Sequence, residues 1–307
     1  NLLKKGGIAS IIVPNGYLGN SIKNIVELRE YLLQYRILKI VALPPNSFSR
    51  SGTGVSTSVI FIKKEMVTEN YDIKIASIEN IGYELSKKNT PFKYKKVNGQ
   101  LLLENGKPII DNDLINVKYE IVNTSELQNK ILDVSRYLSV YKNSLSGDIP
   151  IKNLIVPVKE KVKIEKEKEY IYLDIKQIST PIYKKTNLLF GAELPSRAKL
   201  QLQLYDIIVS KLKGNITFSI VLDNVDNIVA SNGFALLRPK DYQSALILFS
   251  NLFTEQFKIQ HNSLCTGSIM ESISETDLLN IRIDSTIETN KYQKVIDALK
   301  LINECGV

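Results

Sequence analysis

Apolar runs near the N-terminus, separated by one amphipathic segment, constrain the fold more than any other feature. Ile8–Val13 is a near-continuous β-branched run, typical of a strand buried on both faces of a parallel sheet. Residues 21–35 have apolar side chains at roughly helical spacing, and residues 36–43 return to a strand-like run. A polar loop over 44–54 precedes another strand at 56–62, and this connection is too short for a crossover helix. The pattern predicts a strand, a helix and a strand, followed by an antiparallel strand.

The composition is typical of an ordinary soluble protein with two parts. The chain has 307 residues, about twice the ~150-residue length expected of one domain, and 44% of them are hydrophobic. Leu2–Gly7 has the features of a last helical turn, so we expect the chain to begin inside a domain. No apolar stretch approaches the roughly 20 residues of a membrane-spanning helix, and no signal segment opens the chain. We predict a cytoplasmic protein with no membrane partner.

Soft metal ligands are scarce. Cys265, Cys305 and the single His261 cannot supply the three or four ligands of a zinc site. His261 and Cys265 lie four residues apart, as a Cys/His nucleophile pair might, but no third orienting motif accompanies them. We predict structural roles for both residues and no metal site.

The formal net charge of +8 fits a polyanionic partner. Lys far outnumbers Arg, and Lys, Asn and Ile are abundant while Trp is absent. An AT-rich genome gives this composition to many unrelated proteins. The charge therefore favours a nucleic-acid partner without identifying one.

Near the N-terminus the sequence contains the blocks Lys5–Gly16, Leu28–Leu33, Leu43-Pro44 with Phe48, and Gly52–Phe61. These blocks resemble the N6-adenine-specific DNA methyltransferases of type I, or fused type II, restriction–modification systems. The resemblance implies that residues 1–64 are the last three strands of a seven-stranded α/β methyltransferase sheet. Ile78–Tyr83 and Asp111–Leu114 resemble the tail that follows the catalytic core in the same family.

The same resemblance defines what this sequence lacks. The family binds S-adenosylmethionine through a glycine-containing turn and positions the target amine with an Asn/Asp-Pro-Pro-Tyr/Phe motif; neither occurs here. The nearest match, Leu43-Pro44-Pro45-Asn46, follows the wrong strand and has the wrong order. We expect no catalytic residue and no cofactor site in this chain, which alone should be inactive. S-adenosylmethionine is implied only for the complete parent enzyme.

Phe48 is the base-stacking candidate. In the family, the loop around Gly52-Thr53-Gly54 borders the pocket that receives a flipped adenine, and an extruded base needs aromatic or apolar walls. The alternative is that Phe48 plugs the core beneath the loop.

A connector is predicted over residues 65–168. Asn98-Gly99 and Asn105-Gly106 are turn signals that favour a small hairpin or loop. A capping box at Ser125-x-x-Gln128 and apolar residues in steps of four and three predict a heptad helix over 125–145. Val158–Glu169, dense in Lys and Glu, is either a linker or an exposed helix.

Residues 169–285 are predicted to form a mixed α+β, β-rich domain. Its sequence blocks include Tyr170–Ile175, Asp206–Lys211, Ala230-Ser231, Thr266-Gly267-Ser268 and Ile273-Ser274. The order of these blocks resembles the target recognition domain of type I specificity subunits. Ala245–Phe257 has the spacing of an amphipathic helix.

The segment from Ile182 to Lys213 holds six basic and two acidic residues, a local balance of +4. Such a patch can neutralise phosphates, while nearby polar side chains can contact base edges. A generic lysine-rich surface is the alternative. The DNA-binding candidates are Lys184, Lys185, Arg197, Lys199, Lys211, Lys213, Gln201, Gln203, Asn215 and Thr217.

Residues 286–307 have helical spacing and would be a C-terminal spacer helix, as in specificity subunits. We expect it to pair with the 125–145 helix, or else each helix covers its own neighbouring sheet. The resemblance predicts sequence-specific recognition of double-stranded DNA, with other restriction–modification subunits or a second copy as partners. The alternatives are a non-DNA scaffold or assembly protein using the two heptad helices, and a small-molecule Rossmann enzyme, whose glycine motif is absent.

Overall fold

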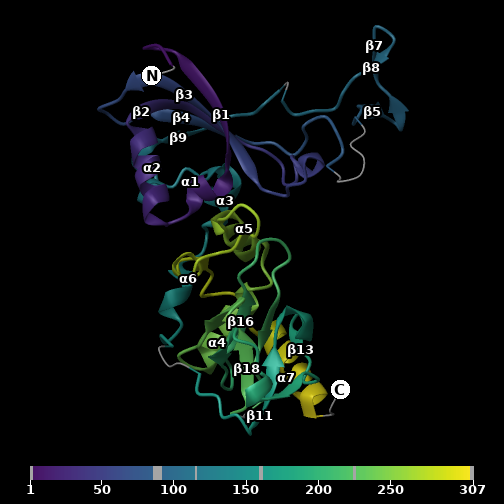
Figure 1. The fold of residues 1–307 in the computed structure, drawn as a ribbon. Coiled ribbons are helices and arrows are strands. Elements are labelled where there is room, and N and C mark those ends of the chain that lie inside the picture. Colours follow the sequence, from purple (N-terminus) through teal and green to yellow (C-terminus); the bar gives the residue numbers. More distant parts are fainter. Residues whose placement is uncertain (1–2, 86–91, 115, 159–161, 224–225, 305–307) are drawn as a thin grey trace. The chain divides into compact units, whose positions relative to one another are not determined.

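The computed structural model describes the chain except for residues 1–2, 86–91, 115, 159–161, 224–225 and 305–307 (Figure 1). The chain is a mixed α/β protein that divides into two compact units. The first unit comprises Asn1–Lys142 and Thr266–Glu271, and the second comprises Asn143–Cys265 and Ser272–Val307. Within the described residues, no helix is long and apolar enough to cross a membrane.

A five-stranded sheet, in the order β1-β3-β2-β4-β9, forms the centre of the first unit. β3 is antiparallel to both of its neighbours, which confirms the antiparallel strand predicted after the short loop. β2 and β4 are parallel, and β9 is antiparallel to β4. The strands are β1 (Ile8–Pro14), β2 (Tyr35–Ala42), β3 (Thr57–Met66), β4 (Asp72–Ser77) and β9 (Glu120–Asn123).

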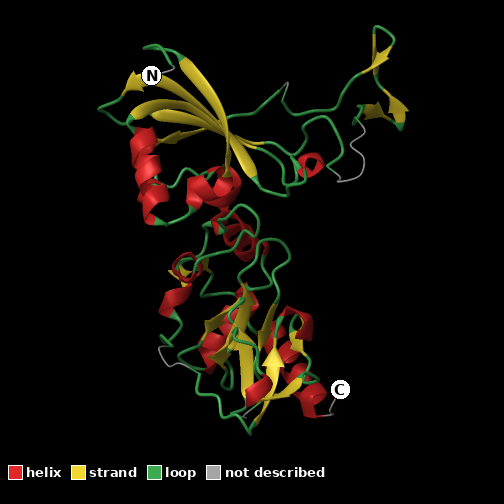
Figure 2. Ribbon diagram, viewed as in Figure 1, coloured by secondary structure: helices red, strands yellow, loops and turns green. Residues whose placement is uncertain are grey.

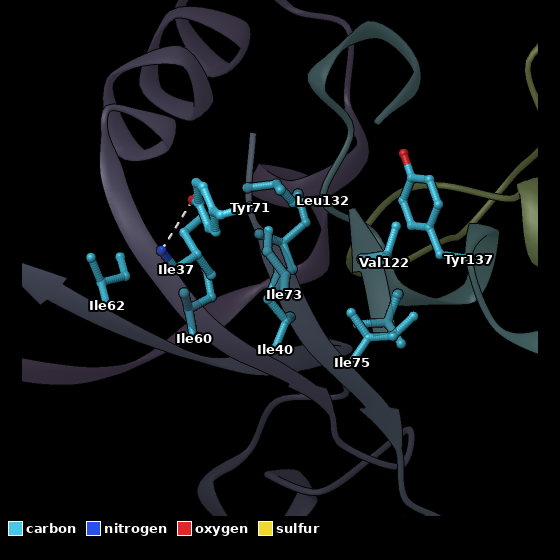
Figure 3. Close-up of a cluster of buried hydrophobic side chains, with 12 residues drawn as sticks. Ile37, Ile40, Ile60, Ile62, Tyr71, Ile73, Ile75, Val122, Leu132 and Tyr137 are labelled. Atoms are coloured by element: carbon cyan, nitrogen blue, oxygen red, sulfur yellow. Dashed lines mark hydrogen bonds between the residues drawn. The ribbon is translucent and has the colours of Figure 1, made fainter. Parts of the chain in front are cut away.

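The core of this unit contains residues from β2, β3, β4 and β9 together with helix α1 (Asn15–Gly19) and the 127–138 segment (Figure 3). Leu32 and Leu33 of helix α2 (Lys23–Leu33) pack against this cluster. Tyr71 places a hydroxyl inside the cluster, where it accepts a hydrogen bond from Ile37 N at 3.1 Å and donates one to Tyr35 O at 3.0 Å. Because both hydroxyl functions are used, the polar group is buried without a lost hydrogen bond.

The expectation that β1 is buried on both faces is wrong in this structure. β1 is an edge strand, and Ile8, Ile11 and Ile12 are about half exposed, at 56%, 45% and 53%. The apolar run specifies a strand correctly. Its burial depends on neighbours that none of the described residues provide.

The predicted heptad helix over 125–145 is also wrong. The segment consists of three 3-10 turns, Thr124–Glu126, Gln128–Lys130 and Val134–Arg136, followed by the short helix α3 (Ser139–Ser144). Positive φ angles at Asn129 and Lys130 interrupt any continuous helix. The capping box is made by Asn123 and Glu126, not by Ser125 and Gln128.

Apolar residues of that segment nevertheless reach the core. Leu132, Val134 and Tyr137 are buried in the first unit's cluster, and Ile131 is buried as well. Apolar residues in this segment recur every three or four positions, although the segment is an irregular chain that packs on a sheet. Such spacing alone therefore does not distinguish an irregular segment from a helix.

Two small hairpins follow β4. One joins β5 (Lys96–Val97) to β6 (Gln100–Leu101), and the other joins β7 (Leu103–Glu104) to β8 (Lys107–Pro108). Asn98-Gly99 and Asn105-Gly106 form the turns, and all four residues have positive φ, as type I′ turns require. The predicted turn signals are confirmed.

The second unit contains two principal sheets (Figure 2). A four-stranded sheet has the order β14-β11-β18-β15, with β11 and β18 parallel. A three-stranded antiparallel sheet has the order β17-β16-β19. The strands of these sheets are β11 (Glu169–Leu173), β14 (Leu188–Phe190), β15 (Ala198–Gln201), β16 (Ile207–Ser210), β17 (Phe218–Ile220), β18 (Ile228–Ser231) and β19 (Phe234–Leu237). Two further pairs of strands join β12 (Ile178–Ser179) to β13 (Ile182–Tyr183) and β10 (Ile149–Pro150) to β20 (Arg282–Ile283).

Four helices complete this unit, α4 (Tyr242–Asn251), α5 (Glu255–Leu264), α6 (Glu275–Leu279) and α7 (Asn290–Glu304). The single helix predicted over 245–257 is two helices, because Thr254 caps a new one by accepting from Phe257 N at 3.2 Å.

The C-terminal helix packs within its own unit, against α4. The Tyr242 hydroxyl lies 3.0 Å from Gln293 Oε1, and the rings of Phe253 and Tyr292 are 5.2 Å apart. Ile296 of this helix has no exposed surface, and Leu299 is also buried. The predicted pairing with a 125–145 helix is therefore wrong, and the assembly function that depended on two heptad helices loses its basis.

Candidate nucleic-acid interface

A groove of about 790 Å³ lies in the second unit, beside β15 and β19. These are edge strands of their two sheets, so their side chains line a concavity that no further strand fills among the described residues. Apolar residues such as Leu200 and Leu236 form much of the lining. Lys152, Lys199, Lys211, Gln201 and Glu275 supply the charged and amide groups.

Three of the predicted DNA-binding residues, Lys199, Lys211 and Gln201, meet in this groove. Lys211 Nζ donates to Asn232 O at 3.1 Å, while Lys199 is exposed. Gln201 Nε2 donates to Asp226 O at 2.7 Å, so its amide already holds a neighbouring loop. The groove thus offers lysines to an anion more readily than it offers Gln201 to a base edge.

The other predicted residues lie outside the groove. Lys185 Nζ contacts Asp223 at 2.6 Å, and Arg197 pairs with Asp174 at 3.3 Å. Lys184, Gln203, Lys213 and Asn215 are exposed, and Thr217 is half-buried.

The turn that carries Lys213 and Asn215 is fixed by helix α5. Gly214 N donates to Asn262 Oδ1 at 2.8 Å, and Asn262 Nδ2 donates back to Gly214 O at 3.2 Å. A fixed turn presents both neighbours to solvent at low entropic cost, which suits a contact to phosphate or base.

One acidic residue is removed from the surface of this unit. Asp206 is buried and receives two hydrogen bonds from Arg238, from Nε at 2.9 Å and from a terminal nitrogen at 2.8 Å. Burial raises the pKa of Asp206, and Arg238 opposes that shift. The ion pair therefore leaves little negative charge from Asp206 at the surface of this unit.

His261 and Cys265 are buried in the second unit, with His261 Nδ1 3.9 Å from Cys265 Sγ. His261 Nε2 lies 2.9 Å from Ser210 O, and since a carbonyl only accepts, this nitrogen carries the proton. Burial lowers the pKa of His261. This geometry supports the predicted structural role, and the described residues contain no cluster of His, Cys, Asp and Glu suited to a metal ion.

The predicted stacking residue, Phe48, is half-buried in the first unit. Its carbonyl accepts from Ser51 N at 2.9 Å, which closes the 3-10 turn of Ser49–Ser51. Gly52 follows with φ of 84°, a conformation that favours glycine. The loop is therefore a defined structure that leaves part of the Phe48 side chain accessible.

The Leu43-Pro44-Pro45-Asn46 sequence has a local structural role. Asn46 adopts a φ of 66°, and its carbonyl accepts from Ser49 N at 2.9 Å and Ser49 Oγ at 2.8 Å. These contacts hold the loop.

Three sequence blocks meet at one point of the first unit. Gly16 N donates to Ser268 Oγ at 2.7 Å, and Ser56 N donates to Ser268 O at 2.8 Å. A Cβ at Gly16 would lie 2.6 Å from Ser268 Oγ, and one at Gly19 would lie 2.7 Å from the Thr266 methyl group. The small residues of α1 therefore allow Thr266–Glu271 to approach closely.

These blocks lie far apart in the sequence, and their contact was not predicted. The available signal was Gly16-x-x-Gly19: two glycines three apart in a helix share a face and often mark a close approach. Nothing in the sequence specified which distant segment would fill it.

Residues 1–140 match the family model described as N-6 DNA Methylase. This match confirms the resemblance carried by the Lys5–Gly16 and Gly52–Phe61 blocks. A comparison with curated proteins finds no match.

Solved structures of restriction–modification proteins are similar to the chain. The HsdS subunit from Thermoanaerobacter tengcongensis is 19% identical, with a TM-score of 0.41 and coverage of 51% of this chain and 43% of that chain. The type IIG restriction endonuclease BpuSI is 12% identical, with a TM-score of 0.39 and coverage of 97% and 42%. A type I methyltransferase subunit from Streptococcus thermophilus is 19% identical, with a TM-score of 0.28 and coverage of 43% and 26%. The chain spans less than half the length of each.

Proposed function

We propose that this chain recognises double-stranded DNA for a restriction–modification adenine-N6 methyltransferase. The observation that carries the proposal is the match of residues 1–140 to the N-6 DNA methylase family. The second unit supports it, because a groove with three lysines and one glutamate can neutralise phosphates. Residues 169–285 act as the target recognition domain in this proposal.

In the complete enzyme, β1 would be an inner strand of the seven-stranded sheet. Its half-exposed isoleucines and free edge suit a strand that pairs with another on that side. S-adenosylmethionine would supply the methyl group and be held by residues outside this chain. Phe48 would stack on the flipped adenine beside the loop that contains Gly52. Other restriction–modification subunits or a second copy would complete the assembly.

Fluorescence anisotropy of a labelled duplex with the full chain, across salt concentrations, tests this proposal. We expect affinity to fall steeply with salt, and Lys199→Gln with Lys211→Gln to flatten that dependence. The matched control is Lys258→Gln with Lys294→Gln, two exposed lysines on helices of the same unit. If heparin binds as tightly as duplex DNA, or if both variants behave alike, recognition by the groove is excluded.

A further inference from the structure

The two hairpins form a β-arm, defined here as residues 92–110, which extends away from the five-stranded sheet (Figure 1). From Phe92 to Pro108 no residue is buried. Phe92 and Leu103 are more than half exposed, at 58% and 56%. A two-stranded hairpin is marginally stable by itself in water, so this arm gains its cohesion mainly from backbone pairing.

The arm has two different sides. Phe92 and Tyr94 lie on one side with ring centroids 6.4 Å apart, and Ile110 pairs with Tyr94. Leu101 pairs with Lys96 on the same side by strand alternation. Lys93 and Lys95 alternate with the aromatic residues and therefore project from the opposite side, whereas Lys96 lies on the aromatic side beside Leu101. The arm therefore carries lysines on both sides.

The arm is basic. Residues 92–110 contain four lysines and one glutamate, a net charge of +3. Lys93 lies 4.0 Å from Glu84, a distant pair. Lys95 and Lys96 form no ion pair with any residue of the described chain. Three lysines within Lys93–Lys96 thus offer positive charge to solvent.

We propose that the β-arm is a second DNA-contacting element, a β-ribbon whose Lys93, Lys95 and Lys96 contact phosphates. An exposed apolar side alone would suit a protein partner equally well. The clustered lysines favour DNA over a protein partner, because protein interfaces are depleted in lysine whereas binding to duplex DNA requires neutralised phosphates. A two-stranded ribbon fits the major groove, and apolar side chains can contact thymine methyl groups there.

This inference rests on the proposed function for its partner, yet it concerns the first unit and not the lysine groove. It predicts that DNA affinity is divided between two elements. Each element can therefore be tested in the full chain while the other is intact.

The experiment measures anisotropy of a labelled 40-base-pair random duplex with the full chain at several salt concentrations. Lys93→Gln, Lys95→Gln and Lys96→Gln together should lower the slope of log affinity against log salt by about 2.7, at about 0.9 per phosphate contact. The matched control changes Lys4, Lys23 and Lys74, three exposed lysines of the same unit, to Gln. We expect a smaller slope change in the control.

A second variant tests the apolar side. Phe92→Ser with Leu101→Ser should weaken duplex binding at every salt concentration without changing the slope, because no phosphate contact is lost. Equal slopes for the arm and control lysine variants would overturn the arm proposal; if the Lys199/Lys211 variant still flattened the slope, the proposed function would stand. An apolar-side variant that alters sedimentation while leaving DNA binding unchanged would assign the arm to self-association and equally overturn it.

Discussion

Strands β1 and β16 have similar composition and opposite surroundings. β1 reads Ile-Ala-Ser-Ile-Ile-Val-Pro and is largely exposed, whereas β16 reads Ile-Ile-Val-Ser and is buried at every position. β16 lies between β17 and β19, so both of its edges are paired, while β1 pairs only with β3 among the described strands. An apolar β-branched run therefore specifies a strand, and the neighbours on its edges and faces decide its burial.

The difference in burial between β1 and β16 implies that the two strands contribute different free energies to the stability of their units. Complete burial of an isoleucine side chain contributes about 1.5–3 kcal/mol, so the second unit gains this from several residues of one strand. In the first unit the buried isoleucines lie in the inner strands β2, β3 and β4, where Ile37, Ile60 and Ile73 have at most 1% exposure. Substitutions of identical chemistry in the two strands should therefore differ strongly.

The largest effect is expected from Ile208→Ala in β16. Ile208 has no exposed surface and belongs to the cluster that includes Leu173, Ile228 and Phe234. Loss of the side chain and the resulting cavity should cost about 2–5 kcal/mol in free energy of unfolding. Chemical denaturation followed by circular dichroism measures it. A loss below 1 kcal/mol would show that β16 is less tightly enclosed than the structure indicates.

The features predicted from sequence were those encoded locally. Asn98-Gly99 and Asn105-Gly106 form the expected turns, because Asn and Gly tolerate the positive φ angles that such turns require. The strands predicted from apolar runs over 8–13, 36–43 and 56–62 correspond to β1, β2 and β3. The prediction of a helix over 125–145 was wrong, because the apolar spacing of this segment reflects its contact with a sheet, which a local pattern does not specify.

The candidate site was predicted only in part. Lys199 and Lys211 were identified by composition, and the groove where they meet is formed by edge strands of two sheets. The buried pairing of Asp206 with Arg238, 32 residues apart, was not visible in the sequence. Long-range contacts of this kind determine which charges reach the surface.

An intermediate effect is expected from Gly16→Ala in the first unit. The new Cβ would lie 2.6 Å from Ser268 Oγ, so either the α1 turn or the Thr266–Glu271 segment must shift. The cost should be about 1–3 kcal/mol, the usual range for overpacking. Gly233→Ala is the matched control, since its Cβ would meet only an ordinary 3.5 Å contact.

A double variant identifies the partner in this contact. Ser268→Gly removes both the acceptor and the obstructing atom, so Gly16→Ala should cost less in that background. Additive free energies of unfolding in the double variant would mean that Gly16 and Ser268 do not interact.

A smaller effect on the free energy of unfolding is expected from lowering the pH, through the buried His261 of the second unit. Burial lowers the pKa of His261 below its unfolded value of about 6.5, so protonation favours the unfolded chain. The stability contribution is complete above that value and is lost as pH falls through the lower folded pKa. Unfolding measured at pH 7 and pH 5.5 should show the loss, and His261→Gln should reduce it. An unchanged pH dependence in the variant would contradict this role.

The smallest effect is expected from Ile11→Ala in β1, the chemical match of Ile208→Ala. Ile11 is 45% exposed and pairs with Ile60 across one side only, so its loss leaves little cavity. The cost should stay below about 1 kcal/mol, the span of strand propensity. A loss comparable to that of Ile208→Ala would show that a self-associated chain already covers β1, and sedimentation would reveal it. If a methyltransferase segment that pairs with β1 is then added, Ile11 should become buried and the same substitution should cost several-fold more.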